Sequence, residues 1–327
     1  MTLSDKAWVR GRVAEIHDLT PTIREFTIAL DRSLPAPAGA HVKVQVQGRV
    51  DTRCYSVVSA DAGTLRIAVK LHPASRGGSA YMWSLKLDAS IRLTPPRCDF
   101  PLTPGAPHYL LIAAGVGVTP LVAMADQLAR SNAVVRMLYL ARSAAEFAYA
   151  KELRVILGDR LVMLDTEVDD RPDLLQEIAL LPVDAELYMC GPLRLMEAVR
   201  SVWLRAGRSL ARLRYETFGS GGNRPAEQFM IKVPRLGKAI EVAENQSMLD
   251  ALEAAGVEVV FECRRGECGL CAVDILETEG TIDHRDIFFS ERQHTENRKI
   301  CACVSRVTGG SVTIDPAWRG DGAFLGA

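Results

Sequence analysis

The stretch Cys263-Arg264-Arg265-Gly266-Glu267-Cys268-Gly269-Leu270-Cys271 places three cysteines at C-x4-C-x2-C spacing. Plant-type [2Fe–2S] clusters are held by cysteines at this spacing and by a fourth, more distant cysteine. Gly266 and Gly269 allow sharp backbone turns, so that amide N–H groups can point at thiolates and sulfides. Because such a cluster carries one electron, the stretch predicts an electron-transfer domain, and the residues before it are the expected source of that electron.

Two other uses of these cysteines fit less well. Zinc sites favour paired C-x2-C or Cys/His spacings. Disulfide frameworks are typical of small secreted chains, whereas this chain has 327 residues and no apolar segment of signal-peptide type in residues 1–8. Five of the eight cysteines lie between Cys263 and Cys303, which favours one local metal site.

The composition is that of a globular protein with several domains. The length predicts roughly two or three domains, and a hydrophobic content of 48% is enough for full cores. The net charge of −1 gives no electrostatic reason to expect nucleic acid as a partner. The longest apolar run, 109–125, is broken by Gly115, Gly117 and Pro120, unlike a membrane helix. We expect a cytoplasmic protein in a reducing compartment, with no membrane partner.

The first hundred residues predict an antiparallel β-barrel. Many short strands separated by turn residues are typical of small barrels and sandwiches. The strands are expected at 7–16, 23–30, 41–46 and 65–69, and one short helix at 78–87.

Two motifs in this region indicate a ligand that carries phosphate. Arg53-Cys54-Tyr55-Ser56 begins a predicted strand, and Arg76-Gly77-Gly78-Ser79 precedes the predicted helix. Arginine together with backbone N–H groups at a helix N-terminus is a suitable phosphate site. Taken singly, the first motif could be an edge strand with an exposed arginine, and the second could be a flexible turn.

In this order, the two motifs resemble the flavin domain of the ferredoxin–NADP reductase superfamily. The resemblance implies that Tyr55 and Ser56 contact the flavin ring and ribityl chain, with Cys54 between Arg53 and Tyr55 in the same binding segment. It also implies that the flavin phosphate is held by a set of residues from both motifs: Arg53, Gly77, Gly78, Ser79 and, as an addition, Arg76.

A segment at the end of the barrel narrows the resemblance. Residues 96–102 read P-R-C-D-F-P-L and resemble the P-R-N-x-F-P-L segment of the phthalate dioxygenase reductase branch. Cys98 stands where asparagine is usual, and we attach no chemistry to it. The branch uses FMN, and no segment that would clamp an adenine is visible, so FMN is favoured over FAD.

The middle of the chain predicts an α/β domain with a parallel sheet. An apolar strand is expected at 109–114, followed by a glycine-rich turn at 115–120 and a helix at 121–131. Thr119 is the expected N-cap of this helix, with Pro120 at its first position. Strands and helices then alternate, which implies a parallel sheet. The strands are expected at 134–140, 161–166 and 186–189, and the helices at 147–157, 173–181 and 193–206.

The turn at 115–120 does not match a full G-x-G-x-x-G fingerprint, because proline replaces the third glycine. As G-x-G-x-T-P, it resembles the NAD(P) site of the same superfamily. The resemblance implies that nicotinamide dinucleotide is bound by residues after three strands: Gly115, Gly117, Thr119, Pro120, Arg142, Ser143, Cys190, Gly191 and Pro192.

Three residues are expected nearest to the reacting rings. The resemblance places Ser56 at the flavin, Cys190 beside the nicotinamide, and Phe218 over the flavin face where the nicotinamide enters. Cys190 could instead be a small buried hydrophobe, and Phe218 could be a core residue. Arg142 could bind the 2′-phosphate of NADPH, but NADH is favoured, as in the branch.

The C-terminal part predicts a β-grasp ferredoxin fold. Residues 219–225 form a glycine-rich, flexible linker. A hairpin is expected at 229–233 and 239–242, and strands at 272–276 and 311–314. Ser247 is the expected N-cap of a helix at 248–255.

Two cysteines compete for the position of the fourth cluster ligand. Cys301 has a common family spacing from Cys271, whereas Cys303 begins a C-V-S-R segment that resembles the family signature C-x-S-R. We choose Cys303. The predicted cluster ligands are therefore Cys263, Cys268, Cys271 and Cys303.

The whole chain thus resembles the phthalate dioxygenase reductase family and is similar to the reductases of vanillate demethylase, phenoxybenzoate dioxygenase and carnitine monooxygenase. The predicted parts are an FMN-binding barrel at 1–104, an NAD-binding α/β domain at 105–218, a linker at 219–227 and a [2Fe–2S] domain at 228–327. The resemblance implies an NADH-dependent oxidoreductase that passes single electrons to a Rieske-type oxygenase. The alternatives are a stand-alone NAD(P)H-dependent flavin reductase and a non-enzymatic metal-binding protein.

Overall fold

The computed structural model describes residues 8–46, 52–72, 77–169, 172–218, 226–244 and 246–316. The chain divides into two compact units, Met1–Thr217 and Phe218–Ala327. Among the helices of the described ranges, none is long and apolar enough to cross a bilayer.

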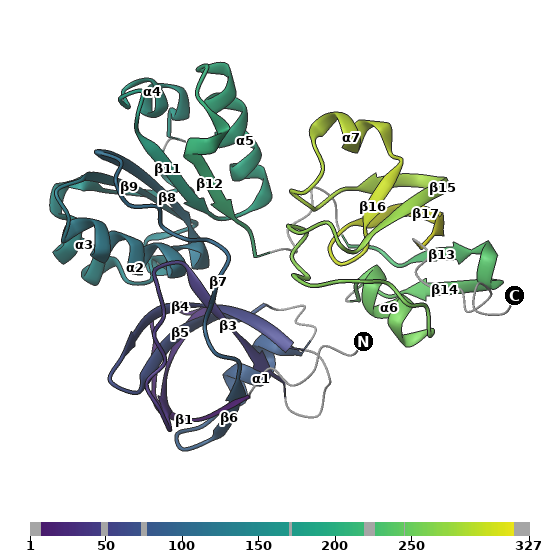
Figure 1. Ribbon diagram of the computed structural model, residues 1–327, viewed down its shortest axis with the longest axis horizontal. Helices are drawn as coiled ribbons and strands as arrows, with labels where there is room; N and C mark the ends of the chain where they lie inside the picture. The colour runs from purple at the N-terminus through teal and green to yellow at the C-terminus, as the bar shows by residue number, and fades with distance from the viewer. Residues whose placement is uncertain are drawn as a thin grey trace, which may run out of the picture. The chain divides into compact units, whose positions relative to one another are not determined.

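The first part of the first unit is an antiparallel barrel (Figure 1). The strands follow the order β4-β5-β2-β1-β6-β3, and a further pairing of β3 with β4 closes the sheet on itself. The short strand β7 pairs with β3. The elements are β1 (Val9–Asp18), β2 (Ile23–Leu30), β3 (Ala40–Gln45), β4 (Thr52–Asp61), β5 (Thr64–Lys70), α1 (Gly78–Ser84), β6 (Ser90–Leu93) and β7 (Arg97–Cys98).

The barrel confirms the predicted fold class and its four predicted strands. Alternation explains why the prediction worked, because β1 buries Val9 and Val13 and exposes the residues between them in part or fully. The predicted helix is confirmed as α1, which ends three residues before the predicted limit at Leu87.

The second part of the first unit is a parallel sheet in the order β10-β9-β8-β11-β12. Helices α2 and α3 lie on one face of it, and α4 and α5 on the other (Figure 1). The elements are β8 (His108–Ala114), η1 (Gly115–Gly117), α2 (Val118–Ala129), β9 (Val134–Ala141), η2 (Ala144–Glu146), α3 (Ala150–Leu157), η3 (Gly158–Arg160), β10 (Leu161–Asp165), α4 (Leu174–Ala179), β11 (Glu186–Cys190), α5 (Leu193–Arg205), η4 (Leu210–Arg212) and β12 (Leu213–Glu216).

The predicted start of α2 is wrong. Thr119 is not the N-cap, because the 3-10 turn η1 leads directly into α2 and Gly117 occupies the cap position without a side-chain bond. The Thr119 hydroxyl instead donates a hydrogen bond to the Val116 carbonyl at 2.9 Å. The hydroxyl group stabilises the turn itself, and Pro120 is the third residue of the helix.

The barrel and the parallel sheet share one hydrophobic core. Ile23 and Val58 of the barrel pack in the same buried cluster as Val118 and Leu121 of α2. A polar contact joins the same two parts, because the Tyr149 hydroxyl donates a 2.6 Å hydrogen bond to the Glu25 carboxylate. Burial, and then the charge of Glu25, raise the pKa of Tyr149 well above its usual value, so the hydroxyl keeps its proton.

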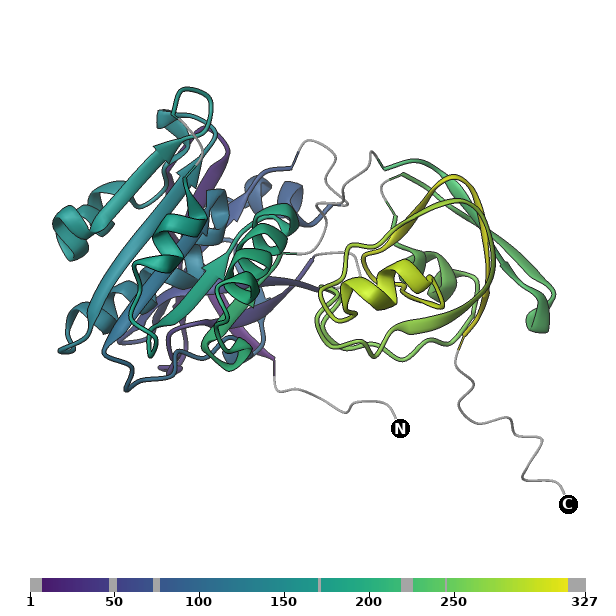
Figure 2. The same ribbon diagram turned by 90° about the horizontal axis from the view of Figure 1, so that it is seen from above.

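The second unit is a five-stranded sheet in the order β14-β13-β17-β15-β16, with helix α6 packed against its core. The paired strands β15 and β17 run together over most of their length (Figure 2). The elements are β13 (Phe229–Val233), η5 (Pro234–Leu236), β14 (Lys238–Val242), α6 (Met248–Ala254), β15 (Ala272–Asp283), α7 (Glu291–Glu296), β16 (Lys299–Cys301) and β17 (Arg306–Asp315).

The predicted hairpin and the Ser247 N-cap are confirmed. The Ser247 hydroxyl accepts from the Asp250 N–H at 3.1 Å, and the Asp250 carboxylate accepts in return from the Ser247 N–H. The predicted strand at 272–276 is too short, because β15 continues through polar residues that pair with β17. Cross-strand pairing, which the sequence pattern does not contain, extends it.

Removal of the Tyr149 hydroxyl tests the contact between barrel and sheet. We expect Tyr149→Phe to lower the free energy of unfolding of the first unit by about 1.5–3 kcal/mol, because a buried charge-assisted hydrogen bond is lost. The measurement is calorimetric unfolding of the full chain.

The matched control is Arg12→Ala, which breaks an exposed ion pair with Asp88. That pair should contribute less than about 1 kcal/mol. Equal effects of the two substitutions would contradict the role of Tyr149.

Candidate functional site

The first predicted motif lies on β4, which pairs with β3 on one side and β5 on the other. Arg53, Cys54, Tyr55 and Ser56 occupy successive positions of this strand. Later in the same strand, Val58 packs in the core shared with α2. The motif is therefore held by the strand that joins the barrel to the parallel sheet.

Two observations show that this region suits a flavin with a phosphate. The Ser56 side chain is buried, and its hydroxyl has no hydrogen-bond partner among the described residues, so a ligand atom is the natural partner. A Cβ added at Gly78 would lie 2.6 Å from Cγ of Arg53. The glycine therefore allows the Arg53 side chain to pack directly against the backbone of the turn. Burial raises the pKa of Tyr55, which keeps its phenol protonated.

The second predicted motif is described from Gly77 onward, and the φ of 100° at Gly77 lies in the left-handed region that favours glycine. Gly78 is the first residue of α1. The Ser79 hydroxyl accepts a hydrogen bond from the His72 N–H at 3.3 Å, which links the turn to the end of the barrel strand β5. Arg76 lies outside the described residues.

The predicted nicotinamide residues gather at the carboxyl edge of the parallel sheet. The sheet order reverses between β8 and β11, and ligands of such sheets bind at this switch point. Gly117 follows β8, and Gly191 follows β11. A Cβ at Gly117 would lie 2.2 Å from the Cys190 carbonyl oxygen, so the two turns touch through their backbones.

The other predicted residues of this edge differ in exposure. Cys190 is fully buried in the shared core, and Pro192 is exposed directly before α5. Arg142 is exposed and Ser143 half-buried, directly after β9. The predicted nicotinamide residues thus lie at or just after the ends of three strands, β8, β9 and β11, at one edge of the sheet.

Glu216, for which no role is predicted from the sequence, lies at the same edge of the sheet. Glu216 lies opposite Cys190 in the pairing of β11 with β12, and it is 2% exposed. The sequence signal that could have identified Glu216 is its position at the end of a strand, directly after Tyr215. Phe218, which is 37% exposed, is the first residue of the second unit, and its predicted place at the flavin stays a prediction.

The predicted cluster loop is a tight turn with backbone donors aimed at sulfur. The N–H groups of Arg265 and Glu267 donate to the Cys263 Sγ at 3.3 and 3.4 Å. Gly269 has a φ of 69°, and a Cβ there would lie 2.3 Å from the Phe288 ring. The conformation favours glycine at this position, and the absence of a side chain lets the Phe288 ring lie over it.

Five thiols meet beside this loop. The Cys303 thiol interacts with both Cys263 and Cys271, the Cys301 thiol interacts with Cys271, and the Cys268 thiol interacts with Cys263.

The charges on these thiols follow from the same contacts. The interaction with Cys303, together with backbone donors, lowers the pKa of Cys263 below its usual value. Interactions with Cys301 and then Cys303 lower the pKa of Cys271 in the same direction. Proton donation to these thiolates, with burial, raises the pKa of Cys301 and Cys303. Thiolates that are already stabilised are the ligands that iron needs, so the residues fit a [2Fe–2S] cluster.

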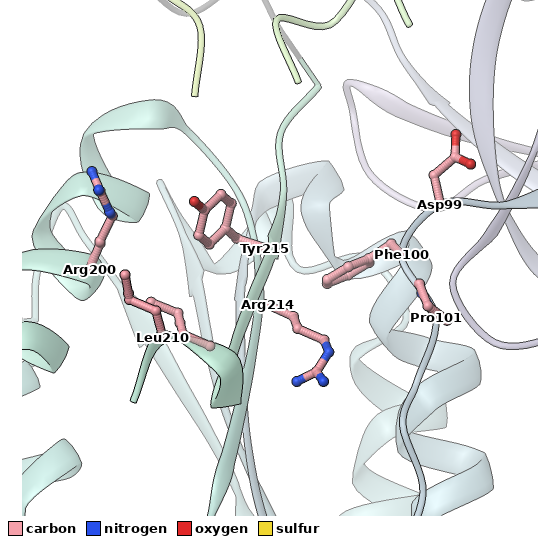
Figure 3. Close-up of a pocket in the computed structure, with 8 residues that line it drawn as sticks. Asp99, Phe100, Pro101, Arg200, Leu210, Arg214 and Tyr215 are labelled. Atoms are coloured by element: carbon pink, nitrogen blue, oxygen red, sulfur yellow. The ribbon is translucent and has the colours of Figure 1, made fainter. Parts of the chain in front are cut away.

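A cavity of about 380 Å³ elsewhere in the first unit does not coincide with these sites (Figure 3). Its lining includes Phe100, Arg200, Arg214 and Tyr215, none of which the sequence analysis assigned. The side chains of Arg200 and Arg214 point in different directions, and Arg214 is paired with Glu186 at 3.1 Å. The two cations do not converge on one anion site.

Two protein-family models match parts of the chain. Residues 231–308 match the 2Fe-2S iron-sulfur cluster binding domain. Residues 89–212 match the N-terminal domain of dimethylamine monooxygenase subunit DmmA-like proteins.

Curated relatives match nearly the whole chain. The beta subunit of the heme-dependent oxidative N-demethylase of Ectopseudomonas mendocina is 39% identical over 312 residues, which cover 93% of this chain and 97% of the relative. The reductase subunit of the toluene-4-sulfonate monooxygenase system of Comamonas testosteroni is 34% identical over 301 residues, which cover 89% of this chain and 93% of the relative.

Two solved structures are also similar to nearly the whole chain. Phthalate dioxygenase reductase is similar with a TM-score of 0.74 at 27% identity, covering 96% of this chain and all of that one. An intact type IV self-sufficient cytochrome P450 monooxygenase is similar with a TM-score of 0.65 at 29% identity, covering 94% of this chain. This chain spans 41% of the length of that P450 chain.

The barrel, the parallel sheet and the thiol-bearing sheet together define an oxidoreductase with flavin, nicotinamide and [2Fe–2S] sites. The chain belongs to the phthalate dioxygenase reductase family, whose members include reductase subunits of oxygenase systems.

The contact between the two turns at the sheet edge leads to a prediction. We expect Gly117→Ala to push the turns apart, because the new Cβ meets a backbone carbonyl at 2.2 Å. Such overpacking costs about 1–3 kcal/mol, and the KM for NADH should rise. The measurement is the rate of flavin reduction at varied NADH concentration.

Gly191→Ala is the graded control, since the nearest atom to its Cβ would be the Ala114 Cβ at 3.0 Å, and the nearest backbone atom would be the Ala114 N at 3.5 Å. Its effect should be smaller. A larger effect at Gly191 than at Gly117 would refute the backbone contact as the cause.

The contacts among the thiols lead to another prediction. We expect Cys303→Ser to lower cluster occupancy by about tenfold or more, because a thiolate ligand is lost. Cys301→Ser should retain most of the cluster. Iron and sulfide analysis, with electron paramagnetic resonance of the reduced protein, measures both variants. The reverse pattern would make Cys301 the ligand.

Proposed function

We propose that this chain is the reductase component of a Rieske-type oxygenase and that its own residues divide the work among three sites. The observation that carries the proposal is the presence of a buried hydroxyl for a flavin, a nicotinamide edge and a four-thiol cage in one chain. When bound, FMN takes a hydride from NADH and passes single electrons to the [2Fe–2S] cluster.

At the flavin, Ser56 supplies the hydrogen-bond donor. Its buried hydroxyl has no other partner among the residues described, and it lies next to Tyr55 on β4. Arg53 and the turn at Gly77 and Gly78 supply a cation and backbone donors for the phosphate. The Arg53 side chain packs against Gly78, which supports a joint role of Arg53 and this turn in binding the phosphate.

At the sheet edge, the turns after β8 and β11 bind the dinucleotide. Gly115 and Gly117 allow close approach to its pyrophosphate, while Cys190 and Gly191 form the floor beside the nicotinamide. Arg142 and Ser143 lie at the end of β9, where an adenosine ribose would be bound. NADH is the proposed donor.

At the cluster, the proposed ligands are Cys263, Cys268, Cys271 and Cys303. The interaction of Cys303 with both Cys263 and Cys271, where Cys301 interacts first with Cys271, supports its choice over Cys301. The domain limits that go with these roles are 1–104, 105–218 and 228–327, with a linker at 219–227.

A specific observation favours a second candidate for the electron acceptor. The relative at 39% identity is named as a subunit of a heme-dependent N-demethylase, and a family model for a dimethylamine monooxygenase subunit matches residues 89–212. A haem-dependent oxygenase that removes methyl groups from amines is therefore the second candidate. Both candidates need the same single-electron supply.

Separation of the flavin step from the cluster step tests the proposal. We expect Cys268→Ser to leave the rate of flavin reduction by NADH within about twofold and to lower cytochrome c reduction by about tenfold or more, because only the later step needs the cluster. Anaerobic rapid-mixing spectroscopy measures both. Unchanged cytochrome c reduction would support the stand-alone flavin reductase instead.

The acceptor is identified by mixing the reduced protein with each type of oxygenase. Reduction of a Rieske centre, and slow or no reduction of a haem-dependent N-demethylase, would support the first candidate. The opposite result would replace it with the second.

A further inference from the structure

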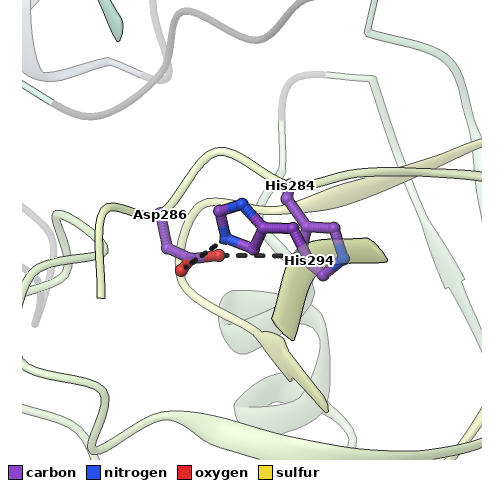
Figure 4. A group of neighbouring side chains, drawn as sticks. All are labelled: His284, Asp286 and His294. Carbon is purple, nitrogen blue, oxygen red and sulfur yellow. Dashed lines mark hydrogen bonds and ion pairs between the residues drawn. The ribbon is translucent and has the colours of Figure 1, made fainter. Parts of the chain in front are cut away.

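Three side chains of the second unit outside the thiol cage bring metal-binding atoms together (Figure 4). His284 and Asp286 follow the end of β15, and His294 lies on α7. One ligand atom from each lies within 4.8 Å of the other two. Two imidazoles and a carboxylate are a donor set typical of zinc and other divalent transition metals.

The carboxylate is fixed and charged. The Asp286 residue is 1% exposed, and its oxygens accept from the Phe289 N–H at 2.9 Å and the Ser305 hydroxyl at 3.2 Å. The His294 Nε2 also lies 3.1 Å from Asp286 Oδ2. Donors that face both oxygens favour the charged form of a buried carboxylate.

His284 has a lone pair that faces this anion. Its Nε2 lies 2.9 Å from the Asn297 Oδ1, and since a carbonyl oxygen only accepts, Nε2 carries the proton. In the neutral imidazole, Nδ1 then carries the lone pair. It is buried without a hydrogen-bond partner among the described atoms and lies 3.7 Å from Asp286 Oδ1, too far for a hydrogen bond. The side chain is only 9% exposed.

Asn297 completes a familiar arrangement. Histidine ligands of metals usually donate their other ring N–H to an oxygen, which fixes the tautomer and the ring orientation. The bond from His284 to Asn297 does this before any ion binds. Two facing acceptors, Nδ1 and Oδ1, are stabilised when a cation lies between them.

Two of the three separations between the ligand atoms are close to those around a tetrahedral ion. Zinc bonds of about 2.0–2.2 Å to nitrogen and oxygen put neighbouring tetrahedral ligands about 3.4 Å apart. The separations here are 3.7 Å between His284 Nδ1 and Asp286 Oδ1, and 3.1 Å between His294 Nε2 and Asp286 Oδ2.

One rearrangement accompanies binding. The rings of His284 and His294 are stacked, with centroids 4.4 Å apart and planes at 18°, whereas an ion shared by both rings must lie in both planes. The ring of His294 has to tilt. Its side chain is 21% exposed, so part of the ring faces solvent and not packed protein.

We propose that His284 Nδ1, the Asp286 carboxylate and His294 Nε2 form a binding site for one divalent transition-metal ion, with zinc as the best match. The site is separate from the four proposed cluster ligands. It has a structural consequence, because the Ile287 N–H, next to Asp286, donates to the Gly266 carbonyl of the cluster loop at 2.9 Å. The ion would tie α7 to the segment that supports this loop.

The test is a zinc titration of the full chain with FMN and cluster in place, by isothermal calorimetry. We expect about one ion per chain and at least about tenfold weaker binding in His294→Gln, which removes a ligand. The matched control is His17→Gln, because His17 is an exposed histidine beside a single carboxylate, Glu15. It should bind zinc as the unchanged chain does.

Zinc X-ray absorption identifies the ligands. Nitrogen and oxygen at about 2.0–2.2 Å support the site, whereas sulfur at about 2.3 Å would mean that zinc had entered the thiol cage and would overturn it. Absence of binding, or unchanged affinity in His294→Gln, would also overturn it.

A second variant serves if His294→Gln fails to fold. Asn297→Gly removes the bond to His284, and glycine tolerates the φ of 49° at this position. Loss of a group that orients a ligand should weaken zinc binding by about tenfold or more. Unchanged affinity would contradict the role of His284.

Discussion

The convergence of five thiols, three of them buried, is the constraint on which the second unit depends. Thiolates removed from water must be stabilised by hydrogen bonds or by a metal. Here backbone N–H groups at Arg265 and Glu267 point at Cys263, and the turn after β16 brings Cys303 beside it. The sheet β15-β16-β17 and the packing of Phe288 on Gly269 hold these segments in place.

The first unit satisfies a stricter demand of distance. Hydride transfer requires the reacting atoms to approach about 3–3.5 Å, so the flavin and nicotinamide sites need a rigid common support. One core supplies it, because Val58 of β4 and Val118 of α2 pack in the same buried cluster. The bond from Tyr149 to Glu25 adds a directional contact between the same parts. Single-electron transfer needs no such contact between atoms, which agrees with a separate compact unit for the thiol cage.

Local sequence patterns predicted the elements whose geometry is local. The Ser247 cap depends on Asp250 three residues later, and the barrel strands depend on alternation. The prediction failed at Thr119, where a 3-10 turn before α2 uses the hydroxyl for the Val116 carbonyl. The predicted strand at 272–276 was also shorter than β15, because pairing with β17, and not the side-chain pattern, extends that strand.

The order of the three sites and the cysteine spacing of the cluster loop were determined by the sequence alone, because glycines and cysteines at set intervals act within a few residues. The tertiary structure decided the contacts between distant residues. Tyr149 and Glu25 are 124 positions apart, and Cys303 meets both Cys263 and Cys271 only after the sheet has formed. The approach of His284, Asp286 and His294 depends in the same way on where α7 packs. No local pattern specifies such contacts, since they follow from how the whole unit buries its core.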